Sequence, residues 1–147
     1  MDDIKKTPLN TTKLGEVRLP ISLFDAPEVG QIKSARFSPR RDSNGNVIEG
    51  SLGKITLEVI NFKLLQVMIK NGGSEADLSP VTLEYVTDEA ILKGYKAEDL
   101  IGRILDLRQS EVALKWVSRG ASGSWGGFKL VCSTLKFVQL PTNKATV

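Results

Sequence analysis

The stretch Lys54-Ile-Thr-Leu-Glu-Val-Ile-Asn-Phe62 gives the clearest indication of the fold. Apolar Ile55, Leu57 and Val59 recur at every second position, which is the period of a strand with one face in a core. The segment therefore predicts a β-strand whose alternate side chains point inward. The positions expected to face outward are Thr56, Glu58 and Ile60.

Turn residues divide the rest of the chain into short segments. Asn44-Gly45 is a strong turn signal between extended segments, and Gly94 ends a short helical pattern. The apolar segment Lys63–Lys70 fits either a strand or a helix. Further strands are expected at Gly15–Leu23, Val29–Ser38, Pro80–Thr87, Arg103–Leu107, Glu111–Arg119 and Phe128–Gln139, and short helices at Asp88–Lys93 and Ala97–Ile101.

The order of these segments predicts a mainly β protein. Strands and helices do not alternate as βαβ units, which argues against a doubly wound sheet. Three strands, a short helix and then further strands, with an optional strand in front, fit the plan of the OB-fold, a five-stranded Greek-key barrel. We therefore expect an OB-like barrel over residues 14–140 with one short helix between its third and fourth strands. Residues 1–13 are expected to form a flexible N-terminal tail, and residues 141–147 a C-terminal tail.

Composition restricts the chemistry. The 147 residues include no histidine and one cysteine, Cys132, so the commonest general base and metal ligand is missing and a zinc site is not expected. One cysteine forms no internal disulfide, which favours a reducing compartment, and no apolar run approaches the roughly 20 residues of a membrane span. The Ser-x-x-Lys string of acyl enzymes occurs at Ser51–Lys54 and Ser133–Lys136, but residues three apart in a strand face opposite sides. We expect a non-enzymatic cytoplasmic protein without cofactor, metal or membrane contact.

Charge is unevenly distributed along the chain, although the formal net charge is only +3. The segment from Glu75 to Glu111 has nine acidic and four basic residues. The segment from Val112 to Val147 has five basic residues and no acidic one. The segment from Lys33 to Lys54 has five basic and two acidic residues. If the fold joins the two basic segments, a basic face results; the alternative is scattered, solvated charge.

The stretch Arg119-Gly-Ala-Ser-Gly-Ser-Trp-Gly-Gly-Phe128 places a tryptophan among glycines and serines. We expect a loop at Arg119–Gly127, which would be the fourth-to-fifth loop of the barrel, and the first-to-second loop at Ser38–Gly53. In such a loop Trp125 either stacks on a flat ligand or packs over the barrel mouth. Trp116 lies in a predicted strand with apolar residues of the same parity, so we expect it in the core.

Single-stranded nucleic acid is held by base stacking on aromatic rings and by basic groups along the phosphates. Phe37 lies at the mouth of the first loop, where stacking and core packing are both open to it. The candidate nucleic-acid contacts are Trp125, Phe37, Arg36, Arg40, Arg41, Lys54, Lys115, Arg119 and Lys129.

Several segments resemble a known group of proteins. They are Leu100-Ile-Gly-Arg-Ile-Leu-Asp-Leu107, Val112-Ala-Leu-Lys-Trp116, Gly123-Ser-Trp-Gly-Gly-Phe-Lys-Leu130, Leu14-Gly-Glu-Val-Arg-Leu19 and Asp42–Asn46. The chain resembles small OB-fold single-stranded-DNA-binding proteins of Gram-positive conjugative plasmids, the PrgE-like proteins. This resemblance implies DNA handling during transfer and assigns no individual contact residue.

The sequence therefore predicts binding of single-stranded DNA, or RNA, with little sequence preference. We also expect a homo-oligomer in which residues 1–13 contact a neighbouring subunit. The main alternative is a β-barrel structural or assembly protein of a phage or conjugation apparatus, whose exposed tryptophan contacts protein. A third hypothesis is an accessory factor that binds duplex DNA.

Overall fold

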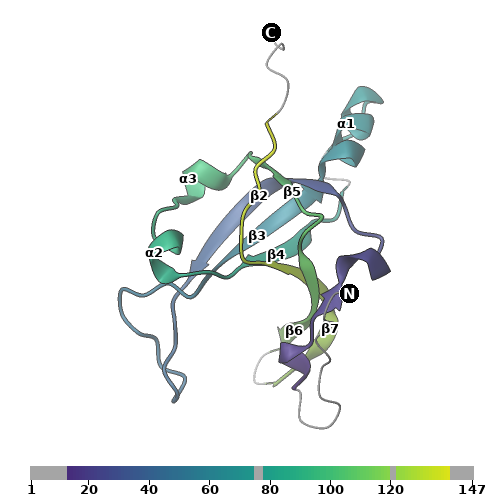
Figure 1. Ribbon diagram of the computed structural model, residues 1–147. Helices are drawn as coiled ribbons and strands as arrows, with labels where there is room; N and C mark the ends of the chain where they lie inside the picture. The colour runs from purple at the N-terminus through teal and green to yellow at the C-terminus, as the bar shows by residue number, and fades with distance from the viewer. Residues whose placement is uncertain (1–12, 75–77, 120–121, 140–147) are drawn as a thin grey trace, which may run out of the picture.

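A seven-stranded mixed sheet forms the body of the protein, as a computed structural model shows for residues 13–74, 78–119 and 122–139 (Figure 1). Its strand order is β1-β6-β7-β4-β3-β2-β5. The strands are β1 (Leu19–Pro20), β2 (Val29–Ser38), β3 (Lys54–Asn61), β4 (Val81–Tyr85), β5 (Ile104–Asp106), β6 (Glu111–Arg119) and β7 (Ser122–Cys132). The mainly β class is thus confirmed, but there are seven strands rather than the expected five, and they do not close into a barrel.

The pairings give this sheet a mixed direction. Strands β2, β3 and β4 form an antiparallel meander, and β6 and β7 form an antiparallel hairpin. The hairpin joins the meander through a parallel pairing of β4 with β7. After β7 the chain returns to the end strand β5, where Leu105 and Phe137 form an isolated bridge. Strands β1 and β5 thus lie at the two ends of the strand order. Strand β6, which pairs with β1, nevertheless follows β5 directly along the chain.

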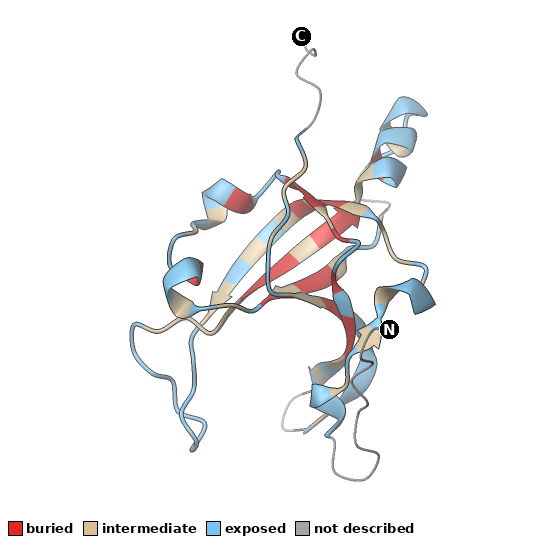
Figure 2. Cartoon of the chain, in the orientation of Figure 1, coloured by how far each residue is buried: buried red, intermediate tan, exposed pale blue. Residues whose placement is uncertain are grey.

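The core lies on the inner face of the β2–β3–β4 meander. Ile55, Leu57 and Val59 are completely buried, which confirms the inward parity predicted for β3 (Figure 2). Thr56 and Ile60, both expected to face outward, are also buried, and Ile60 lies at the end of β3 where the helix α1 begins. The remaining members of the main core cluster are Ile32, Leu83, Tyr85, Leu92, Leu100, Leu105, Leu107, Val112 and Leu130.

Three short helices accompany the sheet. The ambiguous apolar segment forms α1 (Phe62–Lys70), capped by Asn61, whose side-chain oxygen accepts a hydrogen bond of 3.2 Å from the Leu64 amide. The predicted helices are confirmed as α2 (Glu89–Leu92) and α3 (Ala97–Leu100), each burying its last leucine in the core. Across the part of the chain that the structure describes, no helix has the length and apolar character needed to cross a membrane.

The segment before β2 differs from the expected strand over Gly15–Leu23. Only Leu19–Pro20 pairs with β6, between 3-10 turns at Leu14–Glu16 and Ile21–Leu23. Pro20 has no amide hydrogen to extend the ladder, which limits the pairing and fits its edge position. The predicted tail at residues 1–13 and its subunit contact lie outside the described residues, except for Lys13.

The loop between β2 and β3 contains the predicted turn. The Gly45 amide donates to the Asp42 carbonyl at 2.9 Å, and Gly45 has a φ of +84°, a conformation that favours glycine. The Asp42 carboxylate accepts hydrogen bonds from the amides of Asn44 and Asn46. The turn is therefore held by local hydrogen bonds, and the loop projects from the sheet in the same direction as the β6–β7 hairpin (Figure 1).

Candidate nucleic-acid interface

Two tryptophans face each other across the β6–β7 hairpin. Trp116 and Trp125 are register partners, and their rings meet edge to face with centroids 5.1 Å apart and an interplanar angle of 80°. Trp116 is 52% exposed and Trp125 39% exposed. Trp125 therefore lies in a strand rather than in the expected loop, and Trp116 is not the core residue that its parity indicated. We call these two residues the indole pair.

Glycine allows this hairpin to carry an indole flat against its backbone. A β-carbon at Gly123 would lie 2.6 Å from the Trp116 ring, a distance at which the two groups collide. Gly127 has a φ of +90° next to an irregularity in the register between Leu114 and Trp116. The glycines thus belong to an extended hairpin, which explains why a composition typical of loops forms a strand here.

The segment before β2 lies along the same aromatic surface. The ring of Trp125 is 3.5 Å from the position that a β-carbon of Gly15 would occupy. Phe128, 51% exposed, packs on Phe24 with ring centroids 4.9 Å apart. The indole pair and Phe128 therefore form an exposed aromatic surface that is partly supported by the N-terminal segment.

Basic residues gather on the opposite, outer face of the sheet. Nζ of Lys54 lies 3.0 Å, and Nζ of Lys129 2.8 Å, from the same oxygen of Glu84, Oε2. The three residues come from β3, β7 and β4, and we call them the lysine–glutamate cluster. Lys115 lies beside them and donates to the Thr82 hydroxyl at 3.1 Å. The sheet thus brings together three of the predicted lysines.

The carboxylate at the centre of this cluster is stabilised in its charged form. Burial alone would raise the pKa of Glu84, but hydrogen bonds from Lys129 and Lys54, and their positive charges, lower it below its usual value. Its side chain is 14% exposed. Glu84 therefore stays ionised at neutral pH and neutralises part of the charge of the two lysines.

The predicted arginines occupy different surroundings. Arg36 is exposed on the outer face, opposite Thr56 in the register. In the β2–β3 loop, Arg40 contacts Glu89 at 3.4 Å and Arg41 donates to the Gly45 carbonyl at 2.9 Å. Arg119 ends β6, where its backbone pairs with Ser122. Arg36 is the arginine closest in register to the lysine–glutamate cluster.

Phe37 does not join either surface. It pairs with buried Ile55 and packs, partly buried, against the core cluster. Of the two roles open to it from sequence, the structure favours packing. Of the two predicted aromatic contacts, Trp125 alone is exposed, and it lies against Trp116, which we expected in the core.

The predicted basic and aromatic groups do not share one face of the hairpin. Successive side chains of a strand point to opposite faces, so Lys115 and Trp116 lie on opposite sides of β6, as do Lys129 and Phe128 on β7. Glu84, Thr82 and Glu58 were missed as neighbours of the lysines, although the alternation in β3 and β4 places them on the outer face.

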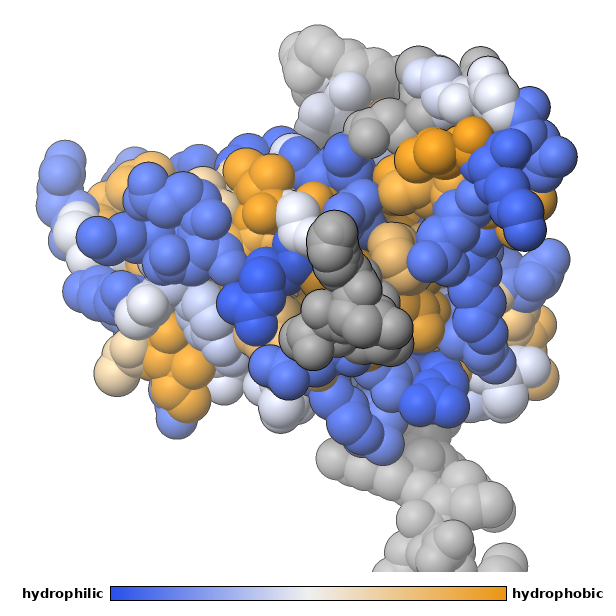
Figure 3. All heavy atoms as spheres, turned by 90° about the horizontal axis from the view of Figure 1, so that it is seen from above, coloured by the Kyte–Doolittle hydropathy of each residue, from blue (hydrophilic) through white to orange (hydrophobic). Residues whose placement is uncertain are grey.

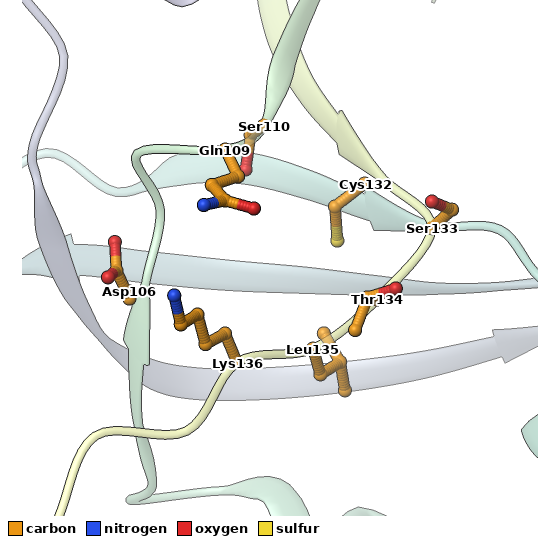
Figure 4. Close-up of a pocket in the computed structure, with 8 residues that line it drawn as sticks. All are labelled: Asp106, Gln109, Ser110, Cys132, Ser133, Thr134, Leu135 and Lys136. Atoms are coloured by element: carbon orange, nitrogen blue, oxygen red, sulfur yellow. The ribbon is translucent and has the colours of Figure 1, made fainter.

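A polar pocket of about 370 Å³ lies where the chain leaves β7 (Figure 4). Burial raises the pKa of the Cys132 thiol to about 11, so it is a poor nucleophile at neutral pH. Hydrogen bonds from the Arg108 side chain and backbone lower the pKa of Asp106 to about 2, so it is a weak base. In Figure 4 the Lys136 ammonium points towards Asp106, which places opposite charges side by side. The burial of Cys132 and the ion pair of Asp106 therefore argue against these two groups as a nucleophile and a base.

No known protein family, curated protein or solved structure matches the chain.

Proposed function

We propose that the protein has an OB-like Greek-key arrangement in which β2, β3, β4, β6 and β7 correspond to the five barrel strands. The β2–β3–β4 meander, the parallel pairing of β4 with β7 and the β6–β7 hairpin support this correspondence. The bridge from Leu105 to Phe137 supports it as well, because it links the chain after β7 to the end strand next to β2. In an OB-fold the loops that flank the binding face are the first-to-second and fourth-to-fifth loops.

Within this arrangement we propose that the protein binds single-stranded DNA with little sequence preference and without catalysing a reaction. The observation that carries the proposal is the exposed indole pair at the β6–β7 hairpin. Large aromatic surfaces held open to solvent suit base stacking, which contributes about 1–3 kcal/mol per base. A role in conjugative DNA transfer and a homo-oligomer, both expected from the sequence, are part of this proposal.

The lysines of the outer face would hold the phosphates. Because they lie opposite the indole pair, we propose that the strand crosses the hairpin at the edge of β6. Strand β1 pairs with β6 only at Glu111 and Val112, and the 3-10 turn Leu14–Glu16 lies beside β6 without pairing, so the rest of this edge forms no ladder among the described strands. Lys115 and Trp116 are neighbours at this edge and would engage a phosphate and a base of the same crossing strand.

An oligo-dT titration tests the proposal. The tryptophan fluorescence of the wild type should be quenched by oligo-dT at low salt and less by duplex DNA. The logarithm of the affinity should fall with the logarithm of the salt concentration, with a slope of about −0.7 per phosphate contact. Absence of quenching at low salt, or equal affinity at low and moderate salt, would contradict binding through stacking and phosphate contacts.

A protein-assembly role is the alternative, and the surface of α1 favours it. Leu64, Val67 and Ile69 of this projecting helix are 46%, 56% and 59% exposed. Orange apolar surface gathers on the right of Figure 3, the side to which α1 projects in Figure 1. For an assembly protein, Val67→Glu should lower the mass measured by light scattering, whereas oligo-dT should leave the tryptophan fluorescence unchanged.

A further inference from the structure

In the lysine–glutamate cluster on the outer face of the sheet, two ammonium groups form ion pairs with a single carboxylate. One carboxylate oxygen of Glu84 accepts from both Lys54 and Lys129. The Lys54 side chain is 39% exposed and the Lys129 side chain 19% exposed, so both side chains are in contact with solvent. The arrangement places two positive charges next to each other around a single negative one, where an incoming anion can approach.

A buried hydroxyl belongs to Thr56, the residue that pairs with Glu84 in the register. Thr56 pairs in the register with Glu84 on one side and with Arg36 on the other, so all three belong to the outer face. Thr56 is 5% exposed, and its Oγ1 has no hydrogen-bond partner among the described residues. Buried polar atoms are nearly always paired with protein or with water, so this hydroxyl adds a hydrogen-bonding group to the row between Arg36 and Glu84.

A third ammonium group extends the cluster. Lys115 donates to the Thr82 hydroxyl at 3.1 Å, and that hydroxyl donates to Glu58 at 3.0 Å. Among the residues with described side chains, Lys115 makes no ion pair with a carboxylate. An ammonium has three N–H donors, and each of these lysines uses only one of them in the bonds described here. Donors therefore remain for an oxyanion.

We propose that Lys54, Lys115 and Lys129 form a phosphate-binding subsite, and that Glu84 is the resident anion that a phosphate must displace from the lysines. The inference rests on the proposed function, since a nucleic-acid backbone would supply the phosphate. Glu84 keeps the lysines together in the free protein, but its negative charge opposes the anion that replaces it. The carboxylate therefore lowers the affinity of the outer face and makes the bound strand easier to release.

The test compares Glu84→Gln with the matched control Glu58→Gln, a carboxylate of the same face that is bound to Thr82. Inorganic tripolyphosphate is titrated by calorimetry, and a labelled dT oligonucleotide by fluorescence anisotropy. Glu84→Gln should bind both probes about tenfold more tightly than wild type, because a charge beside the phosphate is removed in a partly screened site. Glu58→Gln should gain less than about threefold, because its carboxylate is not ion-paired to these lysines.

A double variant, measured alongside thermal melting, distinguishes an effect of charge on binding from an effect of unfolding. Adding Lys54→Met to Glu84→Gln should remove most of the gain for both probes, while thermal melting reports the folded fraction of every variant. If folded Glu84→Gln binds no more tightly than Glu58→Gln, the subsite is wrong even if the wild type binds oligo-dT. If tripolyphosphate binding gains as expected but no variant binds oligo-dT, the subsite stands and the proposed function fails.

Discussion

The β2–β3–β4 meander, which we call the body of the sheet, buries its large side chains, whereas the β6–β7 hairpin leaves two of them exposed. In the body, Leu57 of β3 is completely buried among other apolar residues. In the hairpin, Trp116 and Trp125 touch each other but keep 52% and 39% of their surfaces exposed. The comparison indicates that the body stabilises the fold through burial, whereas the hairpin leaves large aromatic surfaces in contact with solvent.

The largest expected effect is a loss of stability when a buried side chain is removed from the body of the sheet. Leu57→Ala should lower the free energy of unfolding by about 2–5 kcal/mol, because it leaves a cavity in a fully packed core. Leu64→Ala, on the exposed side of α1, is the control and should change it by less than about 1 kcal/mol. Chemical denaturation of both variants measures the difference. Equal losses would mean that burial does not distinguish the two positions.

A smaller effect is expected for the ion pair of Asp106 and Arg108, 2.7 Å apart at the end of β5. The pKa of Asp106 is lowered from 3.8 to about 2, so its contribution to stability is complete above pH 4 and is lost as pH falls towards 2. Asp106→Asn should therefore reduce stability at pH 7 by about 1–2 kcal/mol, allowing for solvent screening. Denaturation across this pH range should show the two proteins converging near pH 2; a constant difference would refute the linkage.

The substitution Gly123→Ala tests whether the Trp116 ring packs on Gly123 in the hairpin. A methyl group 2.6 Å from the Trp116 ring forces the indole to move, since the side chain can swing more easily than the backbone. Stability should fall by only about 1 kcal/mol, while the near-ultraviolet circular dichroism of the edge-to-face pair should change strongly. Ser124→Ala, whose residue is exposed in the same strand, should leave the spectrum intact. An unchanged spectrum in Gly123→Ala would mean that the ring does not lie on this glycine.

Sequence alone predicted the body far better than the hairpin. The alternation in Lys54–Phe62 identified the buried face of β3, because one solvated and one packed face impose a period of two. The glycines after Arg119 indicated a loop, because composition does not reveal that an indole from the facing strand covers Gly123. The expected strand Phe128–Gln139 likewise began at Ser122 and ended at Cys132.

The sequence predicts individual residues of the candidate site but not how they are arranged. Lys54 and Lys129 were identified as basic residues, but their common partner depends on the pairing of β4 with both β3 and β7. Such long-range register isn't visible in local patterns, so Glu84 was not recognised. We expected Trp116 in the core because it shares the parity of apolar residues in β6. The hairpin extends beyond the core at this point, so the side chain is exposed although it lies on the same face of the strand as those residues.

Oligo-dT affinity of Trp116→Ala and Trp125→Ala, measured by anisotropy alongside thermal melting, tests the central claim most directly. If the indole pair stacks on bases, each substitution should weaken binding by about one to two powers of ten, as expected from about 1–3 kcal/mol per stacked base. Both variants should remain folded at the assay temperature, because the rings lie outside the core. Folded variants that bind oligo-dT as tightly as the wild type would contradict the claim.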